Sequence, residues 1–139
     1  MYVKIKKIKD GQIPAYKREG DACMDCYARE YVMIKHGERV LVPLGFAMEL
    51  PVGYEGVIRP RSGLTKDKVD VFIGTIDSNY RGEVMACVEN NSGNTIVVGP
   101  KERICQLAIR EAPQIAWEVV EELSDSNRGE KGFGSSGIK

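Results

Sequence analysis

Residues that could bind a phosphorylated ligand are grouped around a proline in the middle of the chain. In residues 59–64 (RPRSGL), Pro60 fixes a turn that leads Arg61 and Ser62 into a short predicted helix. Free backbone N–H groups and the dipole at the start of a helix favour an anion. The alternative is an ordinary strand-to-helix turn with Ser62 as the N-cap, and the adjacent arginine favours the phosphate interpretation.

The C-terminal tail has the composition of a phosphate-binding loop without the surroundings of a dinucleotide fold. Residues 132–137 match G-x-G-x-x-G, but only Ile138 and Lys139 follow, so no helix can receive a pyrophosphate. Glycines still let backbone N–H groups approach phosphate oxygens. Arg128 could form a bidentate pair with a phosphate, and the ring of Phe133 could stack on a base. Ser135 and Ser136 add two hydroxyl donors. The alternative is a flexible, solubilising end.

Four polar residues in predicted strands and turns could carry the chemistry itself. In residues 74–82 (GTIDSNYRG), Asp77 could hold or deprotonate a water and Tyr80 could pack on a sugar, although Asp-Ser-Asn is also ordinary turn material. Asp25 and Gln106 are each flanked by strand-type residues, a pattern that by itself indicates solvent-facing positions. None of these residues would identify a site alone.

The elements that must position these residues are predicted to be short strands. The chain has 139 residues, 42% hydrophobic and 29% charged, enough for one domain with its own core. Alternating segments between frequent turn signals predict an all-β, jelly-roll-like barrel. We expect one brief helix at 62–68, capped by Ser62, and a last strand at 117–123. Residues 1–123 form the predicted domain, and residues 124–139, with four glycines and four serines, a flexible arm.

Charge and cysteine content exclude several classes of function. Twenty basic residues balance twenty acidic ones, so no global field attracts nucleic acid or an anionic membrane, and an anionic ligand needs a local cluster. The chain has no bilayer-length apolar run and no signal-like start, which predicts a cytoplasmic protein. Cys23 and Cys26 form a C-x-x-C, but Cys87 and Cys105 lie singly, so we expect reduced thiols in strands and no metal at cysteine.

Taken in order, five segments resemble the five motifs of the trimeric dUTPase family. They are residues 20–26 (GDACMDC), 60–64 (PRSGL), 74–83 (GTIDSNYRGE), 102–107 (ERICQL) and 128–137 (RGEKGFGSSG). The resemblance covers essentially the whole chain, and the second and fifth motifs are the specific ones. Family residues are replaced by Cys23, Met24, Cys26, Asn79, Lys131 and Ser136. Cys23 stands where the family has a glycine, a residue that permits close backbone approach.

The resemblance implies a Mg²⁺-dependent dUTP diphosphatase that cleaves dUTP to dUMP and pyrophosphate. Such an enzyme limits uracil incorporation into DNA and supplies dUMP for dTMP synthesis. The family's members are threefold homotrimers, and each site draws on all three chains. By that resemblance Asp77 activates the attacking water, and Asp25 binds the metal through a water. The implied substrate-binding residues are Arg61, Ser62, Gly63, Gly74, Ile76, Tyr80, Gln106, Arg128, Phe133, Gly134, Ser135 and Ser136.

Two other functions remain open at this level. A dCTP deaminase, or a bifunctional deaminase and dUTPase, shares the fold and resembles the chain near Ile76-Asp77 and Val88-Glu89-Asn90. That family typically has R-S-S where this chain has Arg61-Ser62-Gly63, and it lacks this tail. The second alternative is a nucleotide-sensing or interaction protein without catalysis, because a fold does not dictate a function.

Overall fold

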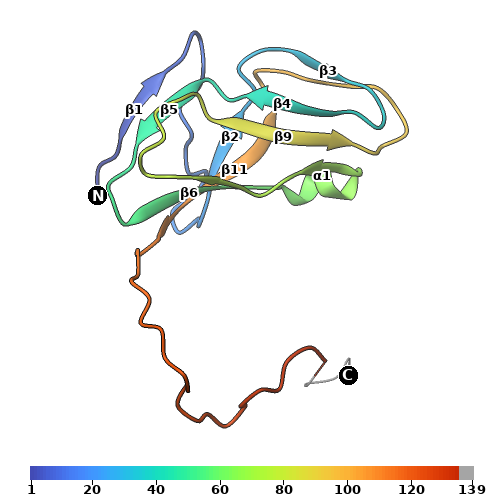
Figure 1. The fold of residues 1–139 in the computed structure, drawn as a ribbon. Coiled ribbons are helices and arrows are strands. Elements are labelled where there is room, and N and C mark those ends of the chain that lie inside the picture. The colour runs from blue at the N-terminus through green and yellow to red at the C-terminus, as the bar shows by residue number, and fades with distance from the viewer. Residues whose placement is uncertain (135–139) are drawn as a thin grey trace.

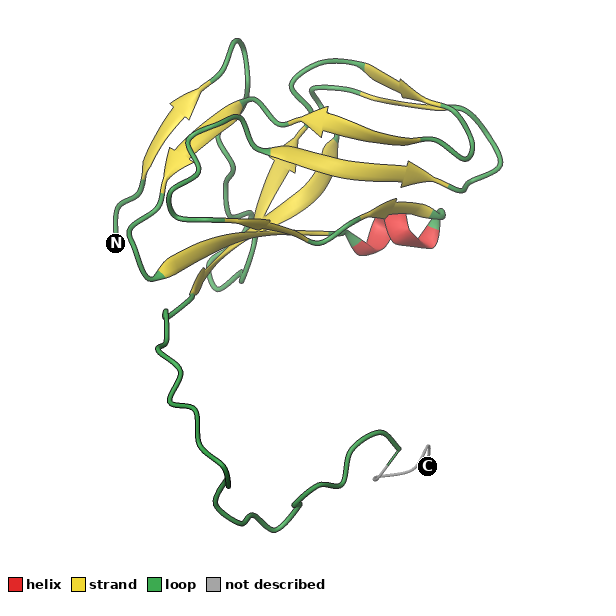
Figure 2. Cartoon of the chain, in the orientation of Figure 1, coloured by secondary structure: helices red, strands yellow, loops and turns green. Residues whose placement is uncertain are grey.

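In its described residues the chain folds into a mostly β structure with one short helix (Figures 1 and 2). The computed structural model describes residues 1–134. The strands are β1 (Lys4–Lys7), β2 (Met24–Tyr27), β3 (Val32–Ile34), β4 (Arg39–Pro43), β5 (Phe46–Glu49), β6 (Tyr54–Arg59), β7 (Val69–Val71), β8 (Gly74–Ile76), β9 (Met85–Asn90), β10 (Ile96–Val98) and β11 (Arg103–Glu111), and the helix is α1 (Ser62–Lys66). The expected mostly β fold with one brief helix is confirmed.

Antiparallel pairing connects strands that are far apart in the sequence. A four-stranded sheet has the order β2-β11-β6-β8, and a three-stranded sheet has the order β4-β9-β7. Two further pairs, β1-β5 and β3-β10, complete the described pairing. The first sheet matters most for function, because it joins strands from four of the five motif regions or their immediate neighbours.

The core lies between the inner faces of these sheets. Alternation along β9 is typical: Ala86, Val88 and Asn90 are buried, and the residues between them are not. The largest buried apolar side chains are Phe46, Ile34, Leu44, Ile58, Ile104, Leu107, Val42, Val84 and Val88. Buried Asn90 donates to the carbonyls of Ile34 (2.8 Å) and Asn94 (2.7 Å), so it fastens a turn.

Two local predictions are wrong. Residues 117–123 form no strand; the chain leaves the sheet after Glu111 and continues as an extended, exposed segment (Figure 1). In the described part of the chain this segment pairs with no strand, and Trp117 and Val119 are 87% and 95% exposed. Ser62 does not cap the helix either: Arg61 occupies the N-cap position with extended backbone, and Ser62 is the first helical residue.

Within residues 1–134, no helix is both long enough and apolar enough to cross a lipid bilayer.

Candidate functional site

Asp25 and Gln106 face each other across the β2–β11 ladder. The register pairs Gln106 with Asp25 and, one step further, Cys105 with Cys26. Successive strand side chains point to opposite faces. The two cysteines point into the core, 1% and 0% exposed, so the carboxylate and the amide share the opposite face of the sheet. Two polar residues that were unremarkable in the sequence thus become direct neighbours.

Arg103 reaches the same face because of an irregularity in β11. The pairing shifts by one residue between Arg103 and Cys105, so that Ile104 is an extra residue on this strand. Ile104 and Cys105 are consecutive and both buried. A bulge of this kind redirects the side chains on one side of it. As a result, Nη1 of Arg103 lies 3.5 Å from Oδ2 of Asp25.

Arg61 approaches the same carboxylate from the start of α1. Its Nη1 donates to the main-chain oxygen of Arg103 at 2.8 Å, and its Nε lies 3.8 Å from Oδ1 of Asp25. Ser62 is exposed beside it, and a side chain at Gly63 would meet nothing within 4 Å in this chain. Because α1 has only five residues, its dipole is small. The Arg61 guanidinium and the Ser62 hydroxyl would therefore be the main hydrogen-bond donors to an anion at this position.

These residues line a cleft of about 530 Å³. Its walls carry four basic side chains against two carboxylates, so its local charge is positive although the chain as a whole is neutral. The lining residues are Lys17, Arg18, Asp21, Ala22, Cys23, Asp25, Arg61, Ser62, Arg103 and Gln106. This is the local cluster that an anionic ligand requires, and we call it the basic cleft.

The third motif lines a different cavity, of about 240 Å³, which we call the hairpin pocket. Gly74, Ile76, Asp77 and Tyr80 lie here, and its other lining residues include Ile58, Glu83 and Met85. The N–H of Tyr80 donates to the main-chain oxygen of Asp77 at 3.1 Å. The backbone therefore closes this turn, and the exposed Asp77 carboxylate is not needed for it. The two cavities have no lining residue in common.

The tail residues lie apart from both cavities. Nε of Arg128 donates to the main-chain oxygen of Lys131 at 2.7 Å, and Phe133 is fully exposed. Gly134 has a φ of +77°. Ser135 and Ser136 lie outside the described residues. In a single chain, therefore, no residue of the fifth motif that is described here joins the cleft or the pocket.

Comparison with known proteins decides between the families considered above. Residues 9–137 match the family model described as dUTPase. The chain belongs to the dUTPase family. Over the full length of both chains it is 45% identical to the deoxyuridine 5'-triphosphate nucleotidohydrolase of Orientia tsutsugamushi strain Ikeda. Across 99% of both chains it is 46% identical to the enzyme of that name from Nautilia profundicola.

Solved structures agree with the assignment to the dUTPase family. The fold matches the Staphylococcus bacteriophage 80alpha dUTPase, in a G164S mutant with dUpNHpp, with a TM-score of 0.90 and 26% identity over 99% of each chain. The dUTPase fold therefore brings together residues of the first, second and fourth motifs around Asp25, as the geometry above shows.

Asp25 is a carboxylate of the basic cleft that could help to hold a hydrated magnesium ion. Within residues 1–134 there is no group of three or more His, Cys, Asp or Glu side chains placed to hold a metal. Mg²⁺ often keeps several waters and binds through one carboxylate and substrate phosphates. Asp25, with its arginine contacts at 3.5 and 3.8 Å, keeps oxygen lone pairs that can accept from metal-bound water.

Three basic residues of the basic cleft were not predicted from the sequence. Arg103 lies within the fourth motif, three residues before Gln106, and its positive charge was the available signal. Lys17 and Arg18 precede the first motif as part of a charged run. Because a charged run usually faces solvent, only the fold could place these two at the cleft.

Proposed function

We propose that this chain, as a dUTP nucleotidohydrolase of nucleotide metabolism, holds the two ends of dUTP in the two cavities described above. The triphosphate binds in the basic cleft, and the uracil and deoxyribose bind in a hairpin pocket. The observation that carries the proposal is the different lining of the two cavities: four basic side chains and Asp25 line one, and Gly74, Ile76 and Tyr80 line the other. The products are dUMP and pyrophosphate.

Base selection would rest on β8, which lies at one edge of its sheet in the described chain. Backbone groups near Gly74 and Ile76 can offer a donor and an acceptor together, which match O4 and N3–H of uracil. Cytosine presents the reverse pattern and leaves buried polar groups unpaired, a cost of about 1–3 kcal/mol for each group. Tyr80 would pack under the deoxyribose and exclude a 2'-hydroxyl, and Phe133 would cover the base.

The phosphates would be held by charge-assisted bonds in the basic cleft. Arg61, Ser62, Gln106 and Arg128, with Ser135 and Ser136, are the proposed donors, and Gly63 and Gly134 contribute backbone. Their bonds strengthen as negative charge develops on the phosphate oxygens in the transition state. Bound Mg²⁺ would supply neutralising charge on these oxygens, and Asp25 would hold it in place through a water.

Asp77 would orient and deprotonate the water that attacks the α-phosphorus. The carboxylate is exposed in the hairpin pocket and is not used to close its own turn. A positioned general base contributes about 10²–10⁴-fold to a reaction of this type. The water's oxygen bonds to the α-phosphorus as the bond to the bridging oxygen breaks, and pyrophosphate leaves.

Assembly as a homotrimer would join the two cavities into one site. On one chain they share no lining residue, so a single subunit offers two half-sites. We propose that jelly-roll-like barrels pack about a threefold axis, with the basic cleft and hairpin pocket of each site on different subunits. Residues 124–139 of the third subunit would then close the site. The exposed apolar side chains Ile115, Trp117, Val119 and Leu123 support an assembly that covers them.

We also propose a cytoplasmic location. The free thiols of Cys26 and Cys105 lie opposite each other in the core, and such a pair suits a reducing compartment.

A nucleotide panel with Mg²⁺, read for pyrophosphate and ammonia together, tests the proposal. We expect rapid pyrophosphate release from dUTP, little from dCTP, dTTP or UTP, and no ammonia from dCTP. Sedimentation of the same sample should give a trimer. Ammonia from dCTP would support the deaminase alternative, and a stable monomer that hydrolyses dUTP would exclude the shared site.

A further inference from the structure

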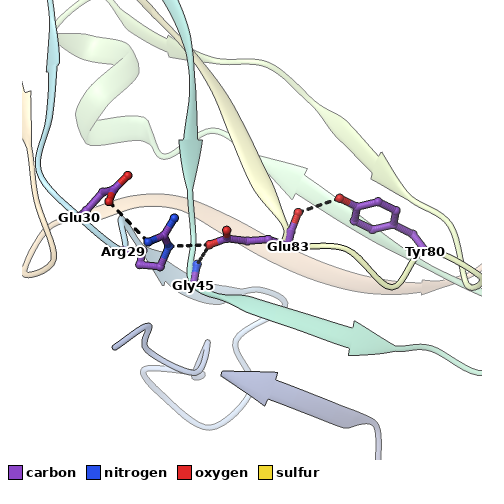
Figure 3. Close-up of polar contacts among 5 residues, drawn as sticks. All are labelled: Arg29, Glu30, Gly45, Tyr80 and Glu83. Carbon is purple, nitrogen blue, oxygen red and sulfur yellow. Dashed lines mark hydrogen bonds and ion pairs between the residues drawn. The ribbon is translucent and has the colours of Figure 1, made fainter. Parts of the chain in front are cut away.

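Glu83, at the end of the third motif, is held by contacts from two other parts of the chain (Figure 3). One carboxylate oxygen, Oε2, accepts from Nε of Arg29 at 2.9 Å and from the backbone N–H of Gly45 at 2.9 Å. The Arg29 and Glu83 side chains are only 12% and 14% exposed. A charge-assisted pair in this setting is short and well ordered, because solvent competes weakly for it.

The residues that hold Glu83 are themselves fixed by the sheet framework. The N–H of Arg29 donates to the carbonyl of Pro43 at 2.8 Å. Gly45 lies in the turn between β4 and β5, with a φ of +78° that favours glycine. On either side of that turn, backbone bonds of 3.0 and 2.9 Å join Leu44 and Phe46 to Val84. The position of Glu83 is therefore set by the body of the domain and not by the segment between β8 and β9 alone.

Tyr80 is bound to the main chain of this same residue. Its hydroxyl donates to the carbonyl oxygen of Glu83 at 2.9 Å. The ring also lies against Gly82, where an added Cβ would be 2.4 Å from the hydroxyl oxygen and 2.7 Å from Cζ. In Figure 3 the Glu83 carboxylate points toward Arg29 and Gly45, and its carbonyl points toward Tyr80. A displacement of Glu83 would thus carry the tyrosine hydroxyl with it.

We propose that Arg29 and Glu83 are positioning residues that hold Tyr80 against the sugar and so set the preference for deoxyribose over ribose. This inference rests on the proposed function, in which Tyr80 packs under the deoxyribose. A 2'-hydroxyl is excluded only if the ring cannot retreat. The largely buried ion pair, the Gly45 N–H and the contact with Gly82 together prevent that retreat.

The test compares two Glu→Gln variants on the same arginine. Glu83→Gln weakens the buried contact with Arg29 and keeps an oxygen for Gly45. Glu30→Gln removes the other carboxylate near Arg29, which lies 3.5 Å away and is 55% exposed, and is the matched control. Steady-state kcat and KM are measured for dUTP and UTP with Mg²⁺, using the trimeric full-length protein.

For Glu83→Gln we expect the ratio of kcat/KM for dUTP over UTP to fall about tenfold or more, because misplacement by about 1 Å can cost about 10²-fold. The change should appear mainly in the KM for dUTP and as a gain in kcat/KM for UTP. Glu30→Gln should keep the wild-type ratio. A merely structural role for Glu83 would lower kcat for both nucleotides equally and leave the ratio unchanged, and that result would overturn the proposal.

Tyr80→Phe supplies a second arm that does not depend on the folding of Glu83→Gln. This substitution removes the hydrogen bond from the Tyr80 hydroxyl to the Glu83 carbonyl, at a ring that is exposed. We expect a similar fall in the ratio of kcat/KM for dUTP over UTP. The double variant should be no worse than the worse single variant, because both changes act through one contact. Undiminished selectivity in Tyr80→Phe would overturn the inference and leave the proposed function intact. A wild-type protein that does not cleave dUTP would overturn both.

Discussion

Asp25 and Gln106 stand directly opposite each other on β2 and β11, and their side chains share the face of the sheet that borders the basic cleft. The pair behind them, Cys26 and Cys105, is part of the core. One residue pair of the β2–β11 ladder therefore fixes both the Asp25 carboxylate, proposed for the metal, and the Gln106 amide, proposed for the phosphates. Groups placed on strands keep their separation better than groups on loops.

We expect Asp25→Asn to raise the Mg²⁺ concentration needed for half-maximal activity by about 10–100-fold, the usual effect of losing a partner that orients a metal's ligands. The substitution keeps the shape of the side chain and removes its charge. A magnesium titration at saturating dUTP measures the shift. Asp21→Asn, at the rim of the same cleft, is the control and should shift the titration much less. An unchanged magnesium requirement in Asp25→Asn would remove this residue from the metal's surroundings.

Asp77→Asn should bind dUTP and fail to turn it over. We expect kcat to fall about 10²–10⁴-fold, since the amide can hold a water but cannot take its proton. Single-turnover pyrophosphate release gives the rate, and calorimetry with a non-hydrolysable dUTP analogue gives the affinity. The exposed Asp67→Asn, just after α1, is the matched control. Loss of affinity together with turnover would mean that Asp77 binds substrate and does not activate water.

Removal of residues 128–139 should leave the folded domain intact and impair catalysis. The described polar contacts of Arg128 and Gly129 stay within the tail, to Lys131 and Ser126. The thermal midpoint should therefore not change. We expect kcat/KM for dUTP to fall at least tenfold to a hundredfold, because a hydrogen bond to a charged group contributes about 1.5–3 kcal/mol. A variant that lacks only residues 138–139 should be normal; equal activity of both truncations would exclude a closing arm.

Cysteine labelling should separate the thiols by their place in the fold. The hydrogen bond with Cys105, and burial, raise the pKa of the Cys26 thiol, and the thiolate is the reactive form. We expect alkylation of Cys23 and Cys87 in the native protein but not of Cys26 or Cys105, even as the pH rises through the ordinary thiol range of about 8–9.

A bound dUTP analogue should protect Cys23, which lines the basic cleft, and leave the labelling of Cys87 unchanged. Peptide mass mapping with and without the analogue measures both effects. The raised pKa also means that the unfolded state loses the Cys26 proton more easily. The free energy of unfolding should therefore decline as the pH rises above about 8.5. Equal labelling of Cys26 and Cys23 in the folded protein would contradict this arrangement of the thiols.

The amino-acid sequence by itself determined the β class of the fold, the single short helix and the family. Alternation of apolar residues between turn signals is a local property, so it could be read before any contact was known. The five ordered motifs can also be recognised in the linear sequence, because each is a short contiguous segment whose residues act together. Asp25 and Gln106 could be predicted as site residues only through those motifs, because an isolated polar residue in a strand carries no local sign of function.

The tertiary structure decided which of these residues meet. Ile104 is an extra residue in β11, and without the shift that it causes, strict alternation would direct Arg103 toward the core with Cys105. The approach of Lys17, Arg18 and Arg61 to the Asp25 face, and the separation of the hairpin pocket from the basic cleft, depend on contacts between distant segments. Residues 117–123 have the composition of a strand, but a strand needs a pairing partner, and residues 1–134 of this chain do not pair with them. Pairing of distant segments is a property of the folded molecule, and local sequence patterns do not encode it.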